Sequence, residues 1–262
     1  MIAMEALIDL EHVHVHHGDF EVLSDVNVSF STGDTTFIIG PSGSGKSTLL
    51  KVAAGLIPPD SGEALVGNKS WMRMSDQELR EFRLYAAFVF QDSALWANMT
   101  IMQNMLLPLQ HHFPRIAVEF HRKKVMAALE KVGYRERTDL RPAELSSGEQ
   151  KLVSFARALV LDPMLLFLDS PLSLVDGGNA TRLVELCTEF RKQHKSQIIV
   201  TNKVEFCLQL ADRVCVMEKG KVIRNGTIWE VAADWPACMG RPSAAQRAIL
   251  EKRKAGEIGG AG

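Results

Sequence analysis

A glycine-rich segment early in the chain has the residue types that bind phosphate groups. It reads Gly40-Pro41-Ser42-Gly43-Ser44-Gly45-Lys46-Ser47-Thr48. Glycines let a backbone curl so that several N–H groups point at phosphates, and a helix that starts there adds positive potential. Lys46 would then reach the β- and γ-phosphates of a nucleotide, and the Ser47 hydroxyl would hold Mg²⁺. With an apolar strand before it and a helix after it, the segment predicts a nucleotide-phosphate loop that binds ATP.

A second segment bears on what happens to a bound nucleotide. Asp169 closes the apolar run Leu165–Leu168, and Ser170 follows it. An aspartate at the end of a buried strand is the expected second contact to Mg²⁺, although aspartate also caps turns. Ser170 stands where a carboxylate base for hydrolysis would be expected, and serine does not accept a proton at neutral pH. The two segments together predict Mg-ATP binding and leave hydrolysis open.

Length and composition limit the classes of protein to which this chain can belong. Its 262 residues suit one α/β domain, or a core with an inserted subdomain, and its 46% hydrophobic residues allow a full core. A net charge of −1 argues against a nucleic-acid partner. We see neither a secretory signal nor an apolar run long enough to span a bilayer. We therefore expect a soluble, cytoplasmic protein that contacts a membrane only through partners.

Apolar patterning and turn residues predict strands that alternate with helices. Expected strands are 6–15, 25–30, 35–39, 86–90, 165–168, 197–201 and 213–217, with a bulge between Leu10 and Val13. Expected helices are 47–56, 117–132, 147–161, 179–194 and 204–211. This order implies a parallel sheet into which the methionine-rich, largely helical stretch 92–160 is inserted. From Arg241 onward, ending in Gly259-Gly260-Ala261-Gly262, we expect a helix that frays into disorder.

The segment Leu145-Ser146-Ser147-Gly148-Glu149 lies at the start of a predicted helix, upstream of Asp169. It resembles the signature motif of the ATP-binding-cassette (ABC) family, in which leucine, serine, glycine, glycine and glutamine are usual. Ser147 replaces one glycine and Glu149 replaces the glutamine. Other landmarks of the family occur in the right order, and the likeness covers residues 6 to about 235.

These other landmarks can be matched residue by residue. Gln91 follows the strand 86–90 as the lever glutamine that senses Mg²⁺ and the membrane partner. His17 stands where the family has an aromatic residue, usually tyrosine, that stacks on adenine. Ser173-Leu174-Val175-Asp176 is similar to the loop that crosses the dimer interface, and Pro58-Pro59-Asp60-Ser61-Gly62 matches a common family turn.

The resemblance implies a fold and partners. The fold would be an α/β P-loop NTPase cassette with a mixed or parallel central sheet, an N-terminal antiparallel β subdomain and an inserted helical subdomain. It would form one domain over residues 1–240, followed by the tail 241–262. The implied partners are a second cassette and integral membrane permease subunits, so the chain would be peripheral on the inner face of the cell membrane.

The resemblance also implies ligands for two ATP molecules, because two cassettes of this family close head to tail around them. Mg²⁺ would be held by Ser47, Gln91 and Asp169. Ser146 and Gly148 would contact the γ-phosphate that the partner holds. The second cassette would form either a homodimer or a heterodimer with this chain. The presence of both signature residues suits a heterodimer in which the chain completes an active site on an intact partner.

Two departures from the family bear on the water that attacks ATP. Family members carry glutamate where this chain has Ser170, and histidine where it has Asn202. Loss of a general base typically lowers the rate by roughly 10²–10⁴, whereas asparagine can still donate a hydrogen bond to the γ-phosphate. The alternative is that another carboxylate, Glu205 or Asp176, acts as the base in place of the missing glutamate. The family gives Glu205 no catalytic role. We therefore predict slow turnover at this chain's own site.

A finer likeness bears on the substrate. Phe90-Gln91-Asp92-Ser93-Ala94-Leu95, Asn104 and Pro108-Leu109 are similar to ATPases of mammalian-cell-entry-type lipid transporters, and importer and lipoprotein-release ATPases share parts of this pattern. The leading function is thus the ATP-binding subunit of a membrane transporter, and the finer likeness implies lipid as its substrate. One alternative is a non-hydrolysing pseudo-ATPase whose ATP-dependent dimerisation gates or scaffolds a partner. Another is a soluble ABC ATPase outside transport.

Two groups of charged or ionisable residues have an ordinary interpretation. His12, His14 and His16 alternate, so they share one face of a strand, which favours a half-exposed surface over zinc or nickel binding. Arg122-Lys123-Lys124 predicts the solvated face of a helix. The four cysteines have no CxxC spacing and predict buried, reduced thiols.

A soft apolar group follows Gln91. Met99, Met102 and Met105, with Leu95 and Trp96, predict packing within the helical insertion. The family also implies that Leu95, Trp96 and Met99 line a groove that receives a short helix of the membrane subunit. The two interpretations are compatible.

Overall fold

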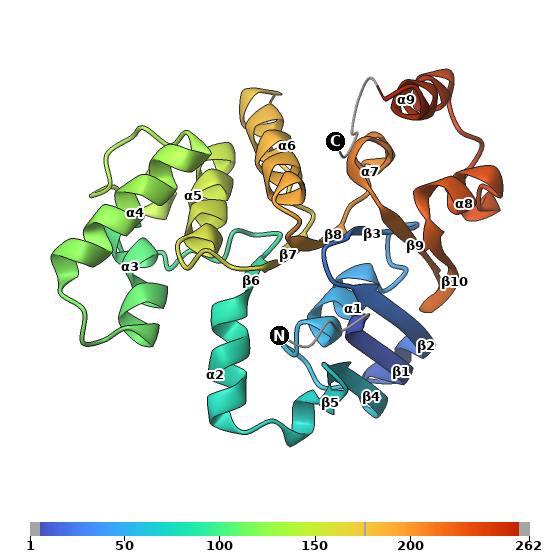
Figure 1. Cartoon of the computed structure of the whole chain (residues 1–262), viewed down its shortest axis with the longest axis horizontal. Helices are drawn as coiled ribbons and strands as arrows, with labels where there is room; N and C mark the ends of the chain where they lie inside the picture. Colours follow the sequence, from blue (N-terminus) through green and yellow to red (C-terminus); the bar gives the residue numbers. More distant parts are fainter. Residues whose placement is uncertain (1–5, 176, 257–262) are drawn as a thin grey trace. The chain divides into compact units, whose positions relative to one another are not determined.

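The computed structural model describes residues 6–175 and 177–256 (Figure 1). The chain divides into two compact units, a first unit of Met1–Ser75 with Thr188–Gly262 and a second unit of Asp76–Cys187. Asp176 and the glycine-rich end 259–262 lie outside the described residues. Within the described part of the chain, no helix combines the length and the apolar character that crossing a membrane requires.

An antiparallel sheet in the first unit contains the N-terminal strands. Its order is β2-β1-β4-β5, and its strands are β1 (Ala6–His17), β2 (Phe20–Ser31), β4 (Ser61–Val66) and β5 (Lys69–Ser70). The β1–β2 register shifts between Leu10 and Val13, where His12 has a φ of 50°, so the predicted bulge is confirmed. β2 begins at Phe20 rather than Asp25 because the exposed residues after the turn still pair with β1.

A second, mostly parallel arrangement in the first unit centres on β3 (Thr35–Ile39). This strand pairs in parallel with β8 (Ser196–Val200) and β9 (Arg213–Glu218), and β10 (Lys221–Thr227) pairs antiparallel with β9. Every residue of β3 and β8 is buried, which explains why neither strand alternates in polarity. The helices of this unit are α1 (Lys46–Ala53), α7 (Val204–Leu210), α8 (Ile228–Ala233) and α9 (Ala244–Lys254).

The second unit combines a parallel strand pair with helices. β6 (Ala86–Val89) pairs with β7 (Leu165–Asp169). Its helices are α2 (Asp76–Tyr85), α3 (Ile101–His112), α4 (Val118–Val132) and α5 (Ser147–Leu159), and α6 (Gly177–Lys192) continues from it into the first unit. In Figure 1, α3, α4 and α5 lie together, and they pack through apolar faces that include Met105, Val125 and Phe155. The chain therefore has the predicted α/β fold with parallel, mixed and antiparallel pairing.

The four cysteines are free thiols, as predicted. Cys187, Cys207 and Cys215 are buried, and Cys238 is half-buried. Burial raises the pKa of Cys215 to about 12 and raises the pKa of Cys187 and Cys207 as well. These thiols are therefore protonated, unreactive parts of the core.

Candidate nucleotide site

The phosphate-binding segment connects β3 directly to α1 in the first unit. Gly40 follows the buried strand, and Lys46 and Ser47 begin the helix. The Lys46 ammonium lies inside the loop, 2.9 Å from the carbonyl oxygen of Gly40 and 2.7 Å from that of Pro41. Its side chain is almost fully buried. A buried cation and the N-terminus of a helix, placed side by side, can together bind the negative charges of a polyphosphate.

Backbone geometry requires glycine at two positions of this loop. Gly40 has a φ of 150°, and a Cβ there would lie 2.1 Å from the carbonyl oxygen of Met217 in β9. Gly45 has a φ of 95°, and a Cβ there would lie 2.8 Å from the carbonyl oxygen of Val22 in β2. Strand backbone cannot easily move away, so a side chain would displace the loop. The loop is thus fixed between β2 and β9, which preorganises it for a ligand.

Asn202 lies at the same sheet edge as the loop. β8 runs parallel to β3 with Val200 opposite Ile38, and the N–H of Thr201 donates to the carbonyl of Ile38 at 3.3 Å. Asn202 comes next and is exposed. Since the carboxyl ends of parallel strands lie at the same edge of a sheet, Asn202 and Gly40 lie next to each other, just after the ends of β8 and β3.

His17 lies near the same loop along β2. It ends β1 opposite Phe20, and both side chains are exposed. Val22 and Leu23, slightly further along β2, are the residues that a Cβ at Gly45 would meet. Because a strand advances roughly 3.3 Å per residue, His17 lies on the order of 10 Å from the loop along the strand. The stacking of His17 on adenine stays a prediction.

In the second unit, the strand pair brings Asp169, Ser170 and Gln91 to one edge. Asp169 ends β7 and is buried, and Ser170 follows with a φ of 49°. Val89 is opposite Leu168 in the parallel pair, so Gln91 and Ser170 lie at the same level past the strands. The Ser170 hydroxyl donates to an oxygen of Asp169 at 3.4 Å. Ser170 is therefore a hydrogen-bond donor to the carboxylate and offers no titratable acceptor for a proton.

Two cations of α5, which the sequence analysis did not single out, hold the backbone after β6. Lys151 donates to the carbonyl of Gln91 at 2.6 Å. Arg157 donates to the carbonyls of Ser93 and Ala94 at 3.1 and 2.9 Å. These two acceptor residues have φ values of 66° and 46°, a conformation that is unfavourable by roughly 1–2 kcal/mol per residue. The helix that begins with the signature segment therefore stabilises a strained loop around Gln91.

Lys151 is a buried cation close to two carboxylates. Its side chain is almost fully buried, and its Nζ also donates to the carbonyl of Phe90 at 3.1 Å. Burial lowers the pKa of Lys151, and the charges of Asp92 and Asp169 partly oppose this effect. Lys151 thus both positions the Gln91 backbone and contributes positive charge near the predicted magnesium carboxylate.

Replacing Lys151 by methionine is expected to lower the free energy of unfolding by about 1–3 kcal/mol, because the carbonyls of Phe90 and Gln91 lose their donor. Urea unfolding measures this change. Lys131→Met removes an exposed lysine of α4 and serves as the control, with an expected change within about 0.5 kcal/mol. Equal losses in the two variants would contradict the positioning role of Lys151.

The signature segment begins α5 with a capping box. The Ser146 hydroxyl accepts a bond from the Glu149 N–H at 3.3 Å, and the Glu149 carboxylate accepts from the N–H and the hydroxyl of Ser146, each at 2.7 Å. A Cβ at Gly148 would lie 2.5 Å from the Asn179 side chain, so α6 packs closely here. Glu149, which replaces the usual glutamine, therefore places its negative charge within hydrogen-bonding distance of Ser146.

Ser147, which replaces a family glycine, makes a specific contact. Its hydroxyl donates to the carbonyl of Leu174 at 2.7 Å. Leu174 is 82% exposed and has a φ of 58°. Ser147 therefore ties the start of α5 to the segment Ser173–Val175, which resembles the family's interface loop.

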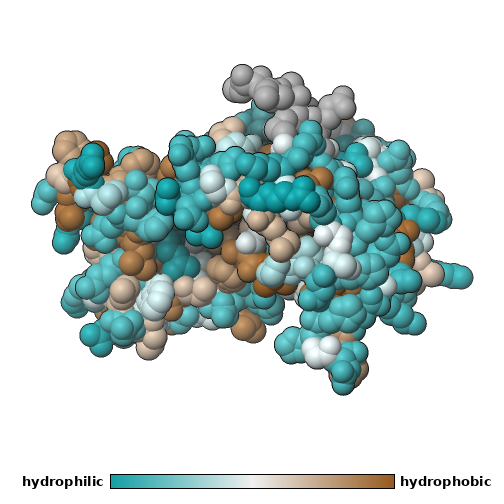
Figure 2. Space-filling view, turned by 90° about the horizontal axis from the view of Figure 1, so that it is seen from below, coloured by the Kyte–Doolittle hydropathy of each residue, from teal (hydrophilic) through white to brown (hydrophobic). Residues whose placement is uncertain are grey.

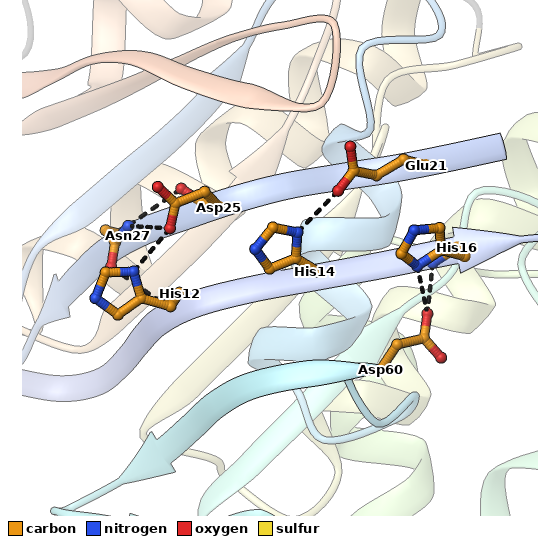
Figure 3. Close-up of polar contacts among 7 residues, drawn as sticks. All are labelled: His12, His14, His16, Glu21, Asp25, Asn27 and Asp60. Atoms are coloured by element: carbon orange, nitrogen blue, oxygen red, sulfur yellow. Dashed lines mark hydrogen bonds and ion pairs between the residues drawn. The ribbon is translucent and has the colours of Figure 1, made fainter.

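The alternating histidines of β1 form separate pairs with carboxylates (Figure 3). The Nδ1–oxygen distances are 2.8, 2.8 and 3.3 Å for His12–Asp25, His14–Glu21 and His16–Asp60. Hydrogen bonds from the paired histidine lower the pKa of each of these carboxyls. Among the described residues, no group of three or more histidine, cysteine, aspartate or glutamate side chains is arranged to hold a metal ion. The histidines are surface residues in hydrogen-bonded pairs, as the alternation favoured.

The methionine-rich group is partly core and partly surface. Met105 is fully buried and Met99 is half-buried, whereas Trp96 is 59% exposed. Buried Asn104 fixes this segment: its amide oxygen accepts from the Trp96 N–H at 2.8 Å, and its amide nitrogen donates to the carbonyls of Trp96, Met99 and Thr100. An exposed indole is thus presented on a well-ordered backbone.

The predicted site residues form two sets. In the first unit are His17, the loop 40–48 and Asn202; in the second unit are Gln91, Ser146, Gly148, Asp169 and Ser170. Glu205, which could have substituted for a missing base, lies in α7 and accepts a hydrogen bond from Gln246 of α9 at 2.9 Å. That contact directs its carboxylate toward the C-terminal helix.

The two units contain the parts of a P-loop nucleoside-triphosphate-binding protein: a strand, a glycine loop and a helix with a buried lysine, and an aspartate that ends a parallel strand. Residues 23–173, more than half of the chain, match the family model described as ABC transporter. The chain therefore belongs to the ABC transporter family and has its ATPase cassette domain.

Relatives and solved structures agree with this assignment. The glutamine transport ATP-binding protein GlnQ of Geobacillus stearothermophilus is 33% identical over 222 residues, which is 84% of this chain and 90% of the relative. The lipoprotein-releasing system ATP-binding protein LolD of Legionella pneumophila is 34% identical over 203 residues, which is 77% of this chain and 88% of the relative. Among solved structures, a dimeric ATP-binding cassette in a post-hydrolysis state, bound to ADP and Pi, superposes on this chain with a TM-score of 0.78 at 28% sequence identity. The match covers 84% of this chain and 98% of the solved chain.

Proposed function

We propose that this chain is the ATP-binding subunit of a membrane transporter and binds Mg-ATP at the interface of a cassette dimer. The observation that carries this proposal is the fixed phosphate loop, with Lys46 buried among its carbonyls. Backbone N–H groups of the loop would bind the phosphates, and His17 would stack on adenine. Ser47, Gln91 and Asp169 supply oxygen ligands of the kind that Mg²⁺ takes, and a bound Mg²⁺ would neutralise phosphate charge.

We also propose that this site hydrolyses ATP slowly. Ser170 donates its hydroxyl to Asp169 and cannot take a proton from water at neutral pH. Asn202 can donate one hydrogen bond from its place beside Gly40, but its amide cannot become charged as an imidazole can. The residues that bind phosphates are therefore kept, and the two that organise the attacking water are changed.

A heterodimer explains this combination best. Ser146 and Gly148 would contact the ATP held by the partner cassette, so the chain can complete an intact site elsewhere while its own stays slow. The exposed Leu174, tied to Ser147, would lie at the cassette interface. Such a complex would be peripheral, on the inner face of the cell membrane, and bound to integral permease subunits.

Glu149→Gln is expected to strengthen ATP-dependent dimerisation about fivefold. The Glu149 carboxylate that is hydrogen-bonded to Ser146 would repel the partner's γ-phosphate. One pair of charges about 4 Å apart in water interacts by about 1 kcal/mol. Glutamine keeps the capping box, so the helix start is unchanged. Sedimentation velocity with Mg-ATP and the partner cassette measures the effect. Glu144→Gln, which changes a nearby exposed carboxylate, is the control and should change nothing; weaker dimerisation of Glu149→Gln would contradict the proposal.

We propose that a membrane subunit docks on Leu95, Trp96 and Met99. The exposed Trp96 and the backbone order imposed by Asn104 support this surface. Trp96→Asp is expected to abolish co-purification with the membrane subunit and to leave ATP binding unchanged. Normal assembly of the variant would place the docking surface elsewhere.

Lipid is the substrate class that we propose for the transporter. The support is the likeness of residues 90–95, Asn104 and Pro108-Leu109 to mammalian-cell-entry-type ATPases, and the similarity to LolD, a lipoprotein-releasing protein. Affinity purification of the chain from its native membranes tests both parts. We expect a multi-span membrane protein and co-purifying phospholipid; their absence from a complex that retains the second cassette would contradict the proposal.

The alternative that Ser170 and Asn202 favour is a pseudo-ATPase, which dimerises on ATP and gates a partner without hydrolysis. Comparing ATP turnover of the complex with and without its membrane subunits separates the two. A transporter subunit gives turnover that the membrane subunits stimulate, whereas a pseudo-ATPase complex gives none.

A further inference from the structure

The connection between α3 and α4 presents a cluster of apolar side chains to solvent. Every residue from Phe113 to Phe120 is exposed. The exposed fraction is 65% for Phe120, 50% for Ile116 and 38% for both Phe113 and Val118. We call these four side chains the apolar tip. Single exposed apolar residues are ordinary, but four within the short segment 113–120 form a patch of the kind that marks an interaction surface.

The apolar tip is built on an ordered turn. The Phe113 N–H donates to the carbonyl of Leu109 in the last turn of α3, at 2.8 Å. The Ile116 N–H donates to the carbonyl of Phe113, and the Phe120 N–H to that of Ala117, each at 3.1 Å. α4 buries its other side through residues such as Val125 and Leu129. The outward direction of the tip is therefore imposed by the fold.

Basic side chains surround the apolar tip. Arg115, Arg122, Lys123 and Lys124 are all exposed, and Glu119 is the one carboxylate in the described segment 113–124. The Nζ of Lys123 lies 5.8 Å from the centre of the Phe120 ring, and that of Lys124 lies 5.9 Å from the Phe113 ring. On the left side of Figure 2, apolar and hydrophilic side chains lie next to each other on the surface. This local excess of positive charge contrasts with the net charge of −1 for the whole chain.

We propose that the apolar tip and its surrounding cations bind directly to the surface of an anionic phospholipid bilayer. The charge of the patch is what selects this partner, because anionic headgroups attract Lys and Arg while the rings and the isoleucine insert at the boundary with the acyl chains. The long side chains of Lys123 and Lys124 can keep their ammonium groups among the headgroups. The chain would then touch the membrane itself, beyond the contact through partners that its sequence predicted.

Co-sedimentation of the full chain with vesicles tests this proposal. The vesicles contain phosphatidylcholine alone or phosphatidylcholine with phosphatidylglycerol. We expect binding only to the anionic vesicles and weaker binding at high salt. Since each cation near an anionic surface contributes roughly a factor of five, Lys123→Glu with Lys124→Glu should weaken binding at least about 25-fold. Ile116→Ser with Phe120→Ser should also weaken it, with the charges left in place.

A matched control changes the same charges elsewhere. Lys192→Glu with Lys252→Glu alters two exposed lysines on α6 and α9 and should leave more than half of the vesicle binding. Equal losses in the control and in the Lys123/Lys124 variant would mean non-specific attraction and would overturn the proposal. So would a wild-type chain that does not bind anionic vesicles at low salt. Patch variants that bind vesicles normally but fail to assemble with the membrane subunit would make this patch a protein-docking surface instead. ATP binding, unchanged in every variant, separates this outcome from failure of the proposed function.

Discussion

Replacing Ser170 by glutamate is expected to raise kcat for ATP hydrolysis by about 10²–10⁴-fold, because it restores a proton acceptor beside Asp169. The backbone at position 170 already holds a residue with a Cβ at a φ of 49°, so the longer side chain adds no new backbone strain. Release of phosphate from the purified chain, alone and in its complex, measures the gain.

Ser170→Gln is the matched control for that change. Glutamine has the size of glutamate but cannot take a proton, so this variant should remain as slow as the wild type. Asn202→His in the Ser170→Glu background should add a further increase, since an imidazole can organise both water and γ-phosphate. If Ser170→Glu remains slow with either residue at position 202, the residues at these two positions are not the cause of slow turnover.

Lys46→Met is expected to weaken Mg-ATP binding by about 2–5 kcal/mol, which is roughly 30-fold to several thousandfold in Kd. The lysine is the buried cation of the loop, and methionine keeps its length while removing the charge that the phosphates need. Titration with a fluorescent ATP analogue measures the Kd.

Lys51→Met, in the last turn of the same helix, controls for the loss of a lysine near the loop. Its side chain is half-exposed and its position lies outside the phosphate-binding segment 40–48, so the Kd of the variant for Mg-ATP should stay within about twofold of the wild type. Thermal unfolding of both variants checks that they are folded. A folded Lys46→Met variant that binds Mg-ATP as tightly as the wild type would show that nucleotide binds elsewhere.

The parts of the site that follow from local geometry could be predicted from the sequence. The loop was predictable because glycines at 40 and 45, a buried strand before them and a helix after them leave few other backbone paths. The bulge in β1 was predictable because polarity stops alternating where the register shifts after Leu10. Met105 was predictable as core because it belongs to an apolar group of a helix.

Other features depend on contacts distant in sequence or on weak patterning. α2 and β10 carry mainly polar, exposed residues, so their apolar periodicity is too weak to indicate an element. Lys151 and Arg157 look like surface residues of a helix, and only the packed fold shows that they hold the backbone near Gln91. The exposure of Phe120 could not be inferred either, because a phenylalanine in a helix is ordinarily expected to be buried.

Binding of Mg-ATP without rapid hydrolysis can be tested by measuring both in one sample of the purified chain. We expect that the chain binds nucleotide, that Lys46→Met weakens this binding, and that bound ATP is hydrolysed far more slowly than about 1 s⁻¹, the lower end of ordinary enzyme rates. Hydrolysis at about 1 s⁻¹ or faster by a homogeneous sample of this chain would contradict this expectation.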